Sequence, residues 1–281
     1  MNPYLQSLRL RTLPLSMSGI ILGTGMAGWT NWQVFALAIC TTLCLQILSN
    51  LCNELGDAQK GTDADQHGRA AYGLQSGALT ETDIRRMIWL FVGLSVVSGI
   101  ALIYNAFGTL FSQQGICFLV LGALAIVGAV TYTLGRHSYG YMGLGDLGVF
   151  LFFGLLSTLG AYYLQKGVLT PEVVWLGVAI GMPCVGVLNL NNVRDMANDR
   201  KHGKRTFASL LGPTGGRIYH TGLLVICLTL FVVFGHLWAL CVWPIWIWHL
   251  WYIWTHEGSA LDLQMPVLML STGLLACIGW L

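Results

Sequence analysis

Residues 189–205 bring together the side chains whose types and spacing could do chemistry. Asn191, Asp195 and Asp199 follow one another at every fourth position, so on a helix their side chains lie on one face. They are accompanied by basic residues: Arg194, Arg200, Lys201, Lys204 and Arg205. The stretch follows an apolar segment, in a chain of which only 9% is charged. This pattern favours a site for a metal ion and a phosphate; a charged loop between two membrane spans is the alternative.

A second copy of this spacing lies about half a chain earlier. Asn53 and Asp57 repeat the Asn-x-x-x-Asp pattern, again at the end of an apolar segment. This copy has Gly61 at the position that corresponds to Asp199, and its next carboxylate is Asp63. Asp57 and Asp63 would lie on different faces of a continuous helix. We therefore expect the chain to leave the helix at Gly61, where glycine makes the turn easy.

Carboxylates gathered at the ends of membrane helices need counter-ions. An aspartate in hydrocarbon costs about 2.5–3.5 kcal/mol, and the C-terminal end of a helix disfavours negative charge. Oxygen ligands without paired His or Cys suit Mg²⁺, which usually completes its shell with water and substrate phosphates. The predicted metal ligands are Asn53, Asp57, Asp63, Asn191, Asp195 and Asp199. The predicted phosphate contacts are Lys60, Arg194, Arg200 and Lys204. A diphosphate with an apolar tail explains both the charge and the burial.

The elements that position these residues are predicted to be membrane helices. The chain has 281 residues, of which 55% are hydrophobic, and a mean hydropathy of +0.67, which is typical of an all-α polytopic membrane protein. No polar block is long enough to fold separately, so we expect a single domain over 1–281. Its nine predicted spans run roughly over 13–29, 32–53, 85–105, 115–133, 146–165, 172–192, 217–236, 237–255 and 264–281. The two motifs end the second and sixth spans, which indicates two pseudo-repeats of four helices with the ninth left over.

The distribution of basic residues predicts the orientation. With a cytoplasmic N-terminus, all of the 14 Lys and Arg residues except Lys166 lie on the inner side, in agreement with the positive-inside rule. Both motifs then face the cytoplasm. No segment has the basic and aromatic interleaving of a nucleic-acid surface, so no nucleic-acid partner is expected. The eight cysteines lie in or beside apolar runs and predict no disulfide framework.

The two motifs resemble those of the UbiA-type intramembrane prenyltransferases, which carry aspartate-rich motifs on their second and sixth helices. Within this superfamily, the chain is most similar to the 1,4-dihydroxy-2-naphthoate polyprenyltransferase branch. The similarity is carried by Arg11-Thr12-Leu13-Pro14, Lys60-Gly61-Thr62-Asp63, Gln75-Ser76-Gly77, Gly143-Leu144-Gly145-Asp146 and Lys204-Arg205-Thr206. The chain departs from this branch at Asp146, where a glutamate is usual. It also lacks the usual Gly-Pro-x-Arg segment before Gln75, and Arg69 is the substitute phosphate contact.

The resemblance implies a reaction. In this family Mg²⁺ ions bridge the aspartates and the diphosphate of a polyprenyl donor, so that an allylic cation can form and an aromatic ring can attack it. In the naphthoate branch the carboxylate-bearing carbon is attacked and CO₂ is lost. The implied catalytic residues are Asp57, Asp195 and Tyr132, the last near the reacting carbon; an interfacial tyrosine is the alternative for Tyr132. The implied location is a bacterial cytoplasmic membrane.

The remaining polar residues have expected roles as well. Loop 58–84 is expected to act as a lid or as an ordinary connector. Asn50 and Asn189 are expected to hydrogen-bond between helices. Arg9 and Arg11 are expected to anchor the topology, and Arg11 could also reach the carboxylate of the acceptor.

Two other functions stay open at the level of sequence. A prenyltransferase for 4-hydroxybenzoate or another aromatic acceptor would need the same two motifs, because these bind the shared diphosphate. An ion-coupled membrane transporter could also have repeated halves and intramembrane carboxylates. Its charged residues would be expected near the midplane, whereas those of this chain lie at the ends of the spans.

Overall fold

A computed structural model of the chain describes residues 2–62 and 72–281. The predicted residues Asp63 and Arg69, and residues 63–71 of the expected lid loop 58–84, lie outside the described residues. The first half contains α1 (Pro3–Ser7), the 3₁₀ turn η1 (Leu10–Thr12), α2 (Leu13–Met26), α3 (Trp32–Gln59), α4 (Glu81–Phe107) and α5 (Gln113–Thr131). The second half contains η2 (Tyr139–Tyr141), α6 (Gly145–Val149), the π-helical segment η3 (Phe150–Leu156), α7 (Ser157–Lys166), α8 (Pro171–Arg194), α9 (Met196–Lys201), α10 (Phe207–Val233), η4 (Leu237–Val242), α11 (Trp243–Thr255), η5 (Gly258–Leu263) and α12 (Gln264–Ile278).

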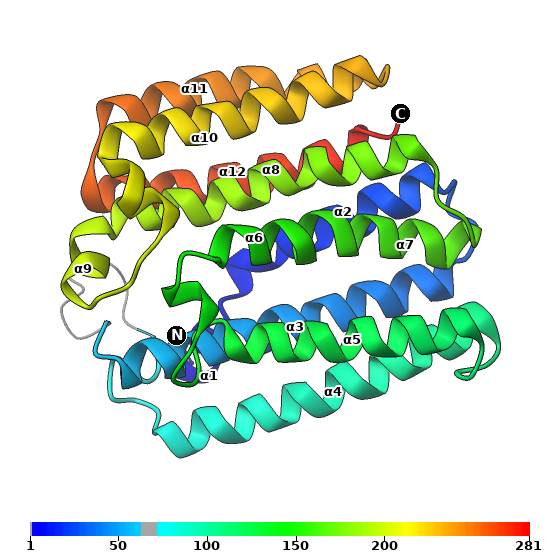
Figure 1. The fold of residues 1–281 in the computed structure, drawn as a ribbon, viewed down its shortest axis with the longest axis horizontal. Coiled ribbons are helices and arrows are strands. Elements are labelled where there is room, and N and C mark those ends of the chain that lie inside the picture. The colour runs from blue at the N-terminus through cyan, green and yellow to red at the C-terminus, as the bar shows by residue number, and fades with distance from the viewer. Residues whose placement is uncertain (1, 63–71) are drawn as a thin grey trace.

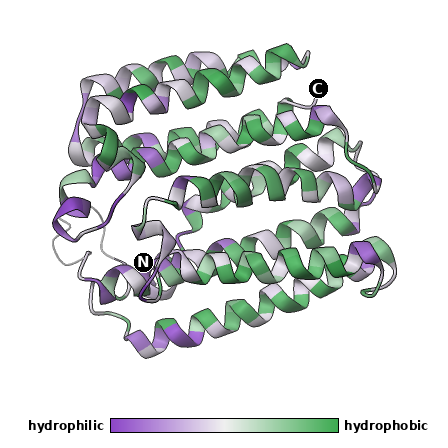
Figure 2. Cartoon of the chain, viewed as in Figure 1, coloured by the Kyte–Doolittle hydropathy of each residue, from purple (hydrophilic) through white to green (hydrophobic). Residues whose placement is uncertain are grey.

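The predicted all-α membrane bundle is confirmed. Eight segments of the described chain are long and apolar enough to cross a membrane. The first predicted span corresponds to α2, which has 14 residues and is therefore shorter than the others. The predicted fifth span is one continuous helical segment made of α6, η3 and α7, with the π-helical η3 in its middle. Figure 2 shows apolar residues along the helices and hydrophilic residues gathered near the end that carries α9.

Side-chain caps fix where the two motif-bearing helices begin. The side chain of Asn31 accepts hydrogen bonds from the first backbone amides of α3, and Thr170 does the same for α8, which also has Pro171 at its start. Both helices then run the length of the bundle to their motifs. The motifs therefore lie at the C-terminal ends of α3 and α8, as the sequence predicts.

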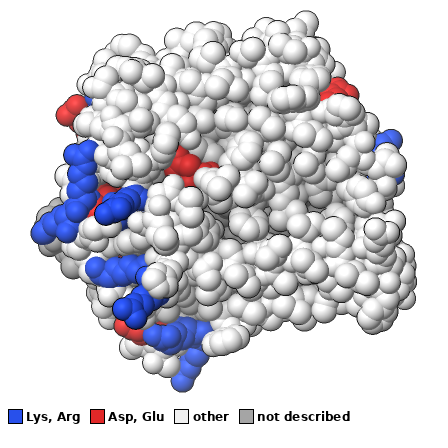
Figure 3. Space-filling view, viewed as in Figure 1, with Lys and Arg blue, Asp and Glu red and all other residues white. Residues whose placement is uncertain are grey.

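The arrangement of the helices agrees with two related halves. α3 packs chiefly against α4, and α8 packs chiefly against α10, so each motif helix pairs with the next long helix in its own half. α2 packs between α7 and α12 and joins the halves. In Figure 1 the motif ends of α3 and α8 lie at the same end of the bundle, close to α9. Figure 3 shows Lys and Arg gathered at this end, whereas the middle of the visible face carries almost no charge.

Candidate functional site

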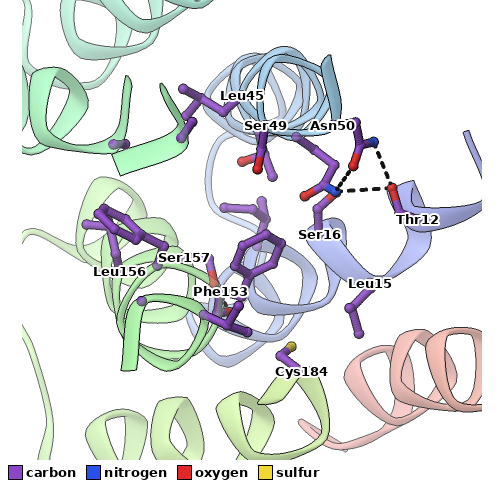
Figure 4. Close-up of a pocket in the computed structure, with 18 of the residues that line it drawn as sticks. Thr12, Leu15, Ser16, Leu45, Ser49, Asn50, Phe153, Leu156, Ser157 and Cys184 are labelled. Carbon is purple, nitrogen blue, oxygen red and sulfur yellow. Dashed lines mark hydrogen bonds between the residues drawn. The ribbon is translucent and has the colours of Figure 1, made fainter. Parts of the chain in front are cut away.

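A cavity of about 360 Å³ lies between the two halves. Its apolar walls come from α2, α3, α5, the segment η3 and α8. In Figure 4, Phe153 and Leu156 lie opposite Leu45 and Ser49 across this space. Polar side chains line part of its wall: Arg9, Arg11, Gln46, Asn50, Asn53, Tyr72, Tyr132, Asn191 and Arg194. The cavity can therefore hold an apolar chain together with a polar group.

Two asparagines tie the walls of the cavity and its surroundings together. Asn50 Nδ2 donates to the backbone oxygen of Leu8 and to Thr12 Oγ1, both at 3.0 Å, which connects α3 to the start of α2 (Figure 4). Asn189 Nδ2 donates to the backbone oxygen of Gly216 at 2.9 Å and connects α8 to α10. The prediction that these two residues hydrogen-bond between helices is confirmed.

The first motif lies in the last two turns of α3. Asn53 Oδ1 accepts a hydrogen bond of 3.2 Å from Thr133 Oγ1, and Asp57 Oδ1 accepts one of 2.7 Å from the hydroxyl of Tyr141. The helix ends at Gln59, and Gly61 has a left-handed φ of 73°. The prediction that the chain leaves the helix around Gly61 is confirmed, and glycine allows this conformation without strain.

The second motif differs from the prediction in one respect. The expected continuous helix is interrupted, because α8 ends at Arg194 and Asp195 connects it to the short helix α9. The backbone amide of Asp195 still donates to Asn191 O at 3.0 Å, and that of Asp199 donates to Asp195 O at 2.8 Å. Asp195 has left the helical conformation (φ −93°, ψ 6°), so α9 can turn toward the first motif. Asn198 Nδ2 on α9 donates to Thr62 O at 2.8 Å and joins the two motifs.

The ammonium of Lys204 pairs with Asp199 and lies within electrostatic reach of Asp57 and Asp195. This ammonium is 3.3 Å from Asp199 Oδ1, and its side chain is 14% exposed. Burial would lower the pKa of Lys204, but attraction to Asp199, Asp57 and Asp195 outweighs it and raises the pKa. Burial, together with repulsion from Asp195 and Asp57, raises the pKa of Asp199 to about 6, although Lys204 opposes the rise. Of the four predicted aspartates, Asp57, Asp195 and Asp199 are therefore close enough for their charges to interact.

Asp199 is the most deeply buried of these carboxylates. It is 1% exposed, and neither of its oxygens accepts a hydrogen bond from the part of the chain that the structure describes. Lys204 is the charged partner of Asp199 in this structure, and the remaining lone pairs of this buried carboxylate are costly unless a further cation satisfies them. The donors nearby are carboxylate and amide oxygens, which are the ligands of a hard divalent cation. The residues thus fit Mg²⁺, although residues 2–62 and 72–281 contain no group of three His, Cys, Asp or Glu that would hold a metal ion unaided.

The predicted phosphate-binding cations have protein partners in this structure. Lys60 Nζ donates to Thr133 O at 2.6 Å and to Ser138 Oγ, and it lies 3.8 Å from the centre of the Tyr141 ring. Burial lowers the pKa of Lys60, partly against the attraction of Asp57. A phosphate contact by Lys60 stays a prediction, and it requires the ammonium to leave the oxygens of Thr133 and Ser138.

Two arginines of the second motif are bound within the protein. Arg194 donates to Asn191, Asp195 and Asp262, and its side chain is 5% exposed. Arg200 donates to Ser209 O at 2.7 Å. A phosphate contact by either arginine stays a prediction, and for Arg194 it requires the release of charged partners. Asp262, which lies far from both motifs in sequence, had no signal that could have marked it.

Two tyrosines complete the site. Tyr132 lines the cavity, and its ring meets that of Tyr139 edge to face with centres 5.2 Å apart. A role for Tyr132 near a reacting carbon stays a prediction. Tyr141, which the sequence did not mark, connects the first motif to the basic residues: it bonds to Asp57 and Thr62 and carries Lys60 on its ring face. The signal in the sequence that could have indicated Tyr141 is its position two residues before the Gly143–Asp146 segment.

The sequence matches the profile of the UbiA prenyltransferase family over residues 13–275. The chain belongs to this family. It is 43% identical to the 1,4-dihydroxy-2-naphthoate octaprenyltransferase of Escherichia coli (strain K12), over 83% of this chain and 77% of that protein. It is 33% identical to the protein of the same name from Mycobacterium tuberculosis (strain ATCC 25618 / H37Rv), over 79% of this chain and 74% of that one. The chain is thus a prenyl-transferring enzyme of a multi-pass membrane family, which decides against the transporter alternative.

Solved structures of the family share the fold. A UbiA homologue from Aeropyrum pernix K1 in its apo form superposes with a TM-score of 0.69 at 16% identity, over 92% of this chain and 96% of that one. A homologue from Archaeoglobus fulgidus bound to GPP and Mg²⁺ gives a TM-score of 0.66 at 14% identity, over 98% and 99% of the two chains. At this identity the likeness establishes the fold of this prenyltransferase and leaves its ligands to be argued from its own residues.

The position of Tyr141 gives a first prediction. Tyr141→Phe removes the hydroxyl that bonds to Asp57 and keeps the ring beneath Lys60. Because a group that orients a metal ligand typically contributes about 10–100-fold to metal affinity, we expect the half-saturating Mg²⁺ concentration for prenyl transfer to rise about tenfold. Tyr104→Phe, at a tyrosine that is 61% exposed, is the matched control. An unchanged Mg²⁺ requirement in Tyr141→Phe would contradict the assignment.

Proposed function

We propose that the enzyme transfers a polyprenyl group from polyprenyl diphosphate to 1,4-dihydroxy-2-naphthoate, with loss of diphosphate and CO₂, to give demethylmenaquinol. The observation that carries the proposal is the convergence of three carboxylates, Asp57 near the end of α3, Asp195 just after α8 and Asp199 on α9, beside an apolar cavity that α3 and α8 line. The names of the relatives from E. coli and M. tuberculosis support this acceptor.

We assign Mg²⁺ to the two motifs. Asp57, Asp195 and Asp199 would hold it, with Asn53, Asn191 and the undescribed Asp63 as further oxygen donors. When bound, Mg²⁺ would neutralise charge on the departing diphosphate. Lys60 and Lys204 are the cations best placed to neutralise the remaining charge on the diphosphate. Both ammoniums lie beside the ring of Tyr141, at 3.8 and 5.6 Å from its centre. Arg69, Arg194 and Arg200 are further candidates for phosphate contacts.

The walls of the cavity are assigned to the prenyl chain. Apolar side chains of η3, such as Phe153 and Leu156, line it and exclude water, which would otherwise quench an allylic cation. Tyr132 would face the reacting carbon, where the electron-rich face of its ring attracts positive charge. Its hydroxyl stays protonated, since burial raises the pKa of Tyr132, and neighbouring Tyr139 and Asp57 raise it further.

The ring chemistry balances without an oxidant. The ring carbon that carries the carboxylate attacks the allylic carbon as the C–O bond to diphosphate breaks, and the adjacent hydroxyl becomes a ketone as its proton leaves. The C–CO₂ bond then breaks, and its electron pair restores the aromatic ring. A proton returns to the ketone oxygen. The products are the prenylated quinol, CO₂ and diphosphate.

We further propose that residues 1–281 act as one domain in a bacterial cytoplasmic membrane, with the motif end facing the cytoplasm. The gathering of Lys and Arg at that end supports this orientation (Figure 3). A membrane-buried cavity also suits a donor whose polyprenyl tail dissolves in the bilayer.

Purified enzyme, a polyprenyl diphosphate and Mg²⁺ should be incubated with each acceptor in turn, and both CO₂ and the prenylated product measured. We expect CO₂ and product in equal amounts with 1,4-dihydroxy-2-naphthoate. Transfer to 4-hydroxybenzoate without CO₂ release would instead establish the other acceptor class. Omission of Mg²⁺ with added EDTA should stop the reaction, and excess Mg²⁺ should restore it.

A further inference from the structure

Arg9 presents an unused pair of donors at the wall of the cavity. It lies between α1 and η1, and its guanidinium is 4.0 Å from the centre of the Tyr72 ring. Both residues line the cavity. The Nε and Nη2 atoms of Arg9 are buried, and neither has a hydrogen-bond partner among the described residues. Buried donors of a charged group that lack partners cost about 1–3 kcal/mol or more, so their retention indicates a missing acceptor.

The backbone of Arg9 is held in an uncommon conformation. Its φ and ψ are both 50°, in the left-handed region that non-glycine residues seldom adopt. Such a conformation costs of order 1–3 kcal/mol and persists where the surrounding structure enforces it. The topology role expected for Arg9 needs only a positive charge near the membrane surface. This role does not explain why the backbone is strained or why the side chain is stacked on Tyr72.

Glu54 connects the two chain segments that carry Arg9 and Tyr72. Its side chain is fully buried, and Oε1 accepts a hydrogen bond of 3.1 Å from Ser7 Oγ and one of 2.8 Å from the backbone amide of Leu74. Ser7 is two residues before Arg9, and Leu74 is two residues after Tyr72. One carboxylate therefore fixes both segments that carry the stacked pair.

Arg11 holds the other side of Tyr72. Its Nη2 donates to the Tyr72 hydroxyl at 3.0 Å. The sequence allowed Arg11 a contact with the acceptor's carboxylate, but Arg11 Nη2 already has a protein partner, whereas the buried Nε and Nη2 of Arg9 have none among the described residues. With the ring fixed, the face of the Arg9 guanidinium is covered, and its Nε–Nη2 edge is the part left for a ligand.

We propose that this edge of Arg9 binds the carboxylate of the aromatic acceptor, an inference that rests on the proposed function. Nε–H and Nη2–H of a guanidinium point in the same direction and match the two oxygens of a carboxylate in a bidentate pair. Lys60 and Lys204 are not among the residues that line the cavity in the described structure, whereas Asn53 and Asn191 of the two motifs are. An acceptor held by Arg9 would therefore share the cavity with the donor and would not compete for the two lysines. An acceptor anchored here places its ring in the cavity that Tyr132 also lines.

Binding without a donor substrate tests this assignment directly. The purified enzyme in detergent is titrated with 1-hydroxy-2-naphthoate, which carries the carboxylate, and with 1-naphthol, which lacks it. In Arg9→Gln we expect the affinity for 1-hydroxy-2-naphthoate to fall tenfold or more, because a charged hydrogen-bond pair is lost. The affinity for 1-naphthol should stay within twofold. Arg86→Gln, at an arginine whose side chain is 78% exposed, is the matched control.

The affinity for geranyl diphosphate reports on folding and should be unchanged in Arg9→Gln. If that variant fails to bind geranyl diphosphate, Arg9→Lys is tested instead. Lysine keeps the positive charge but lacks the two parallel N–H donors of the guanidinium. This variant should bind 1-hydroxy-2-naphthoate several-fold more weakly than the unaltered enzyme. Equal losses for the two aromatic probes, or no loss for either, would overturn the assignment. If the unaltered enzyme binds 4-hydroxybenzoate in place of the naphthoate, the proposed acceptor fails, and the same comparison with 4-hydroxybenzoate and phenol still tests Arg9.

Discussion

Asp57→Asn is expected to lower the rate of prenyl transfer about a thousandfold or more while the protein stays folded. The change keeps the shape of the side chain and removes the charge that would hold Mg²⁺ at the end of α3. Charge stabilisation by a bound metal is worth several kcal/mol, and each loss of about 1.4 kcal/mol slows the reaction tenfold. Asp195→Asn should have an effect of the same size, because Asp195 and Asp57 act on the same group of charges.

The rate should be measured at saturating Mg²⁺ and donor, with thermal unfolding as the test of folding. Glu257→Gln is the matched control, because its carboxylate is 79% exposed and pairs only with Arg217 among the described ion pairs. Near-normal turnover in either aspartate variant would show that the metal assignment is wrong. Loss of turnover in Glu257→Gln as well would show that the effect is not specific to the two motifs.

Lys204→Met is expected to destabilise the enzyme strongly when Mg²⁺ is absent. The ammonium lies among three carboxylates, one of them 1% exposed, and removal leaves their charges uncompensated. Removal of one partner of a buried ion pair typically costs roughly 3–5 kcal/mol. We expect a clearly lower midpoint of thermal unfolding in EDTA. Mg²⁺ should restore much of the loss, because it can neutralise the same carboxylates.

The measurement compares unfolding midpoints with EDTA and with Mg²⁺ for the wild-type enzyme and for each variant. Lys166→Met, at an exposed lysine far from the motifs in sequence, should behave like the wild type in both conditions. A Lys204→Met variant as stable as the wild type in EDTA would mean that the carboxylates do not depend on Lys204. A loss that Mg²⁺ leaves unchanged would argue that the aspartates do not form its binding site.

The ion pairs of Arg194 could be predicted only in part from its neighbours in the sequence. The sequence places it beside Asp195 and predicts a phosphate contact, which is reasonable for a basic residue in such a motif. In the folded protein it also reaches Asp262, near the start of α12. That partner lies in the 3₁₀ turn η5, two spans after the motif, and no spacing rule connects the two. Tyr141 is a similar case, because its contacts with Asp57 and Lys60 depend on how the loop before α6 folds back.

The sequence by itself determined the class of the protein: the apolar runs predict the membrane helices, and the spacing of Asn53, Asp57, Asn191 and Asp195 predicts two motifs at one end of the bundle. These features are local, since hydropathy and helical periodicity act over a few turns of chain. The tertiary structure decided which charges meet. It brought Lys204 among the carboxylates and joined Arg9 to Tyr72 through Glu54, because such contacts depend on the packing of helices that are distant in sequence.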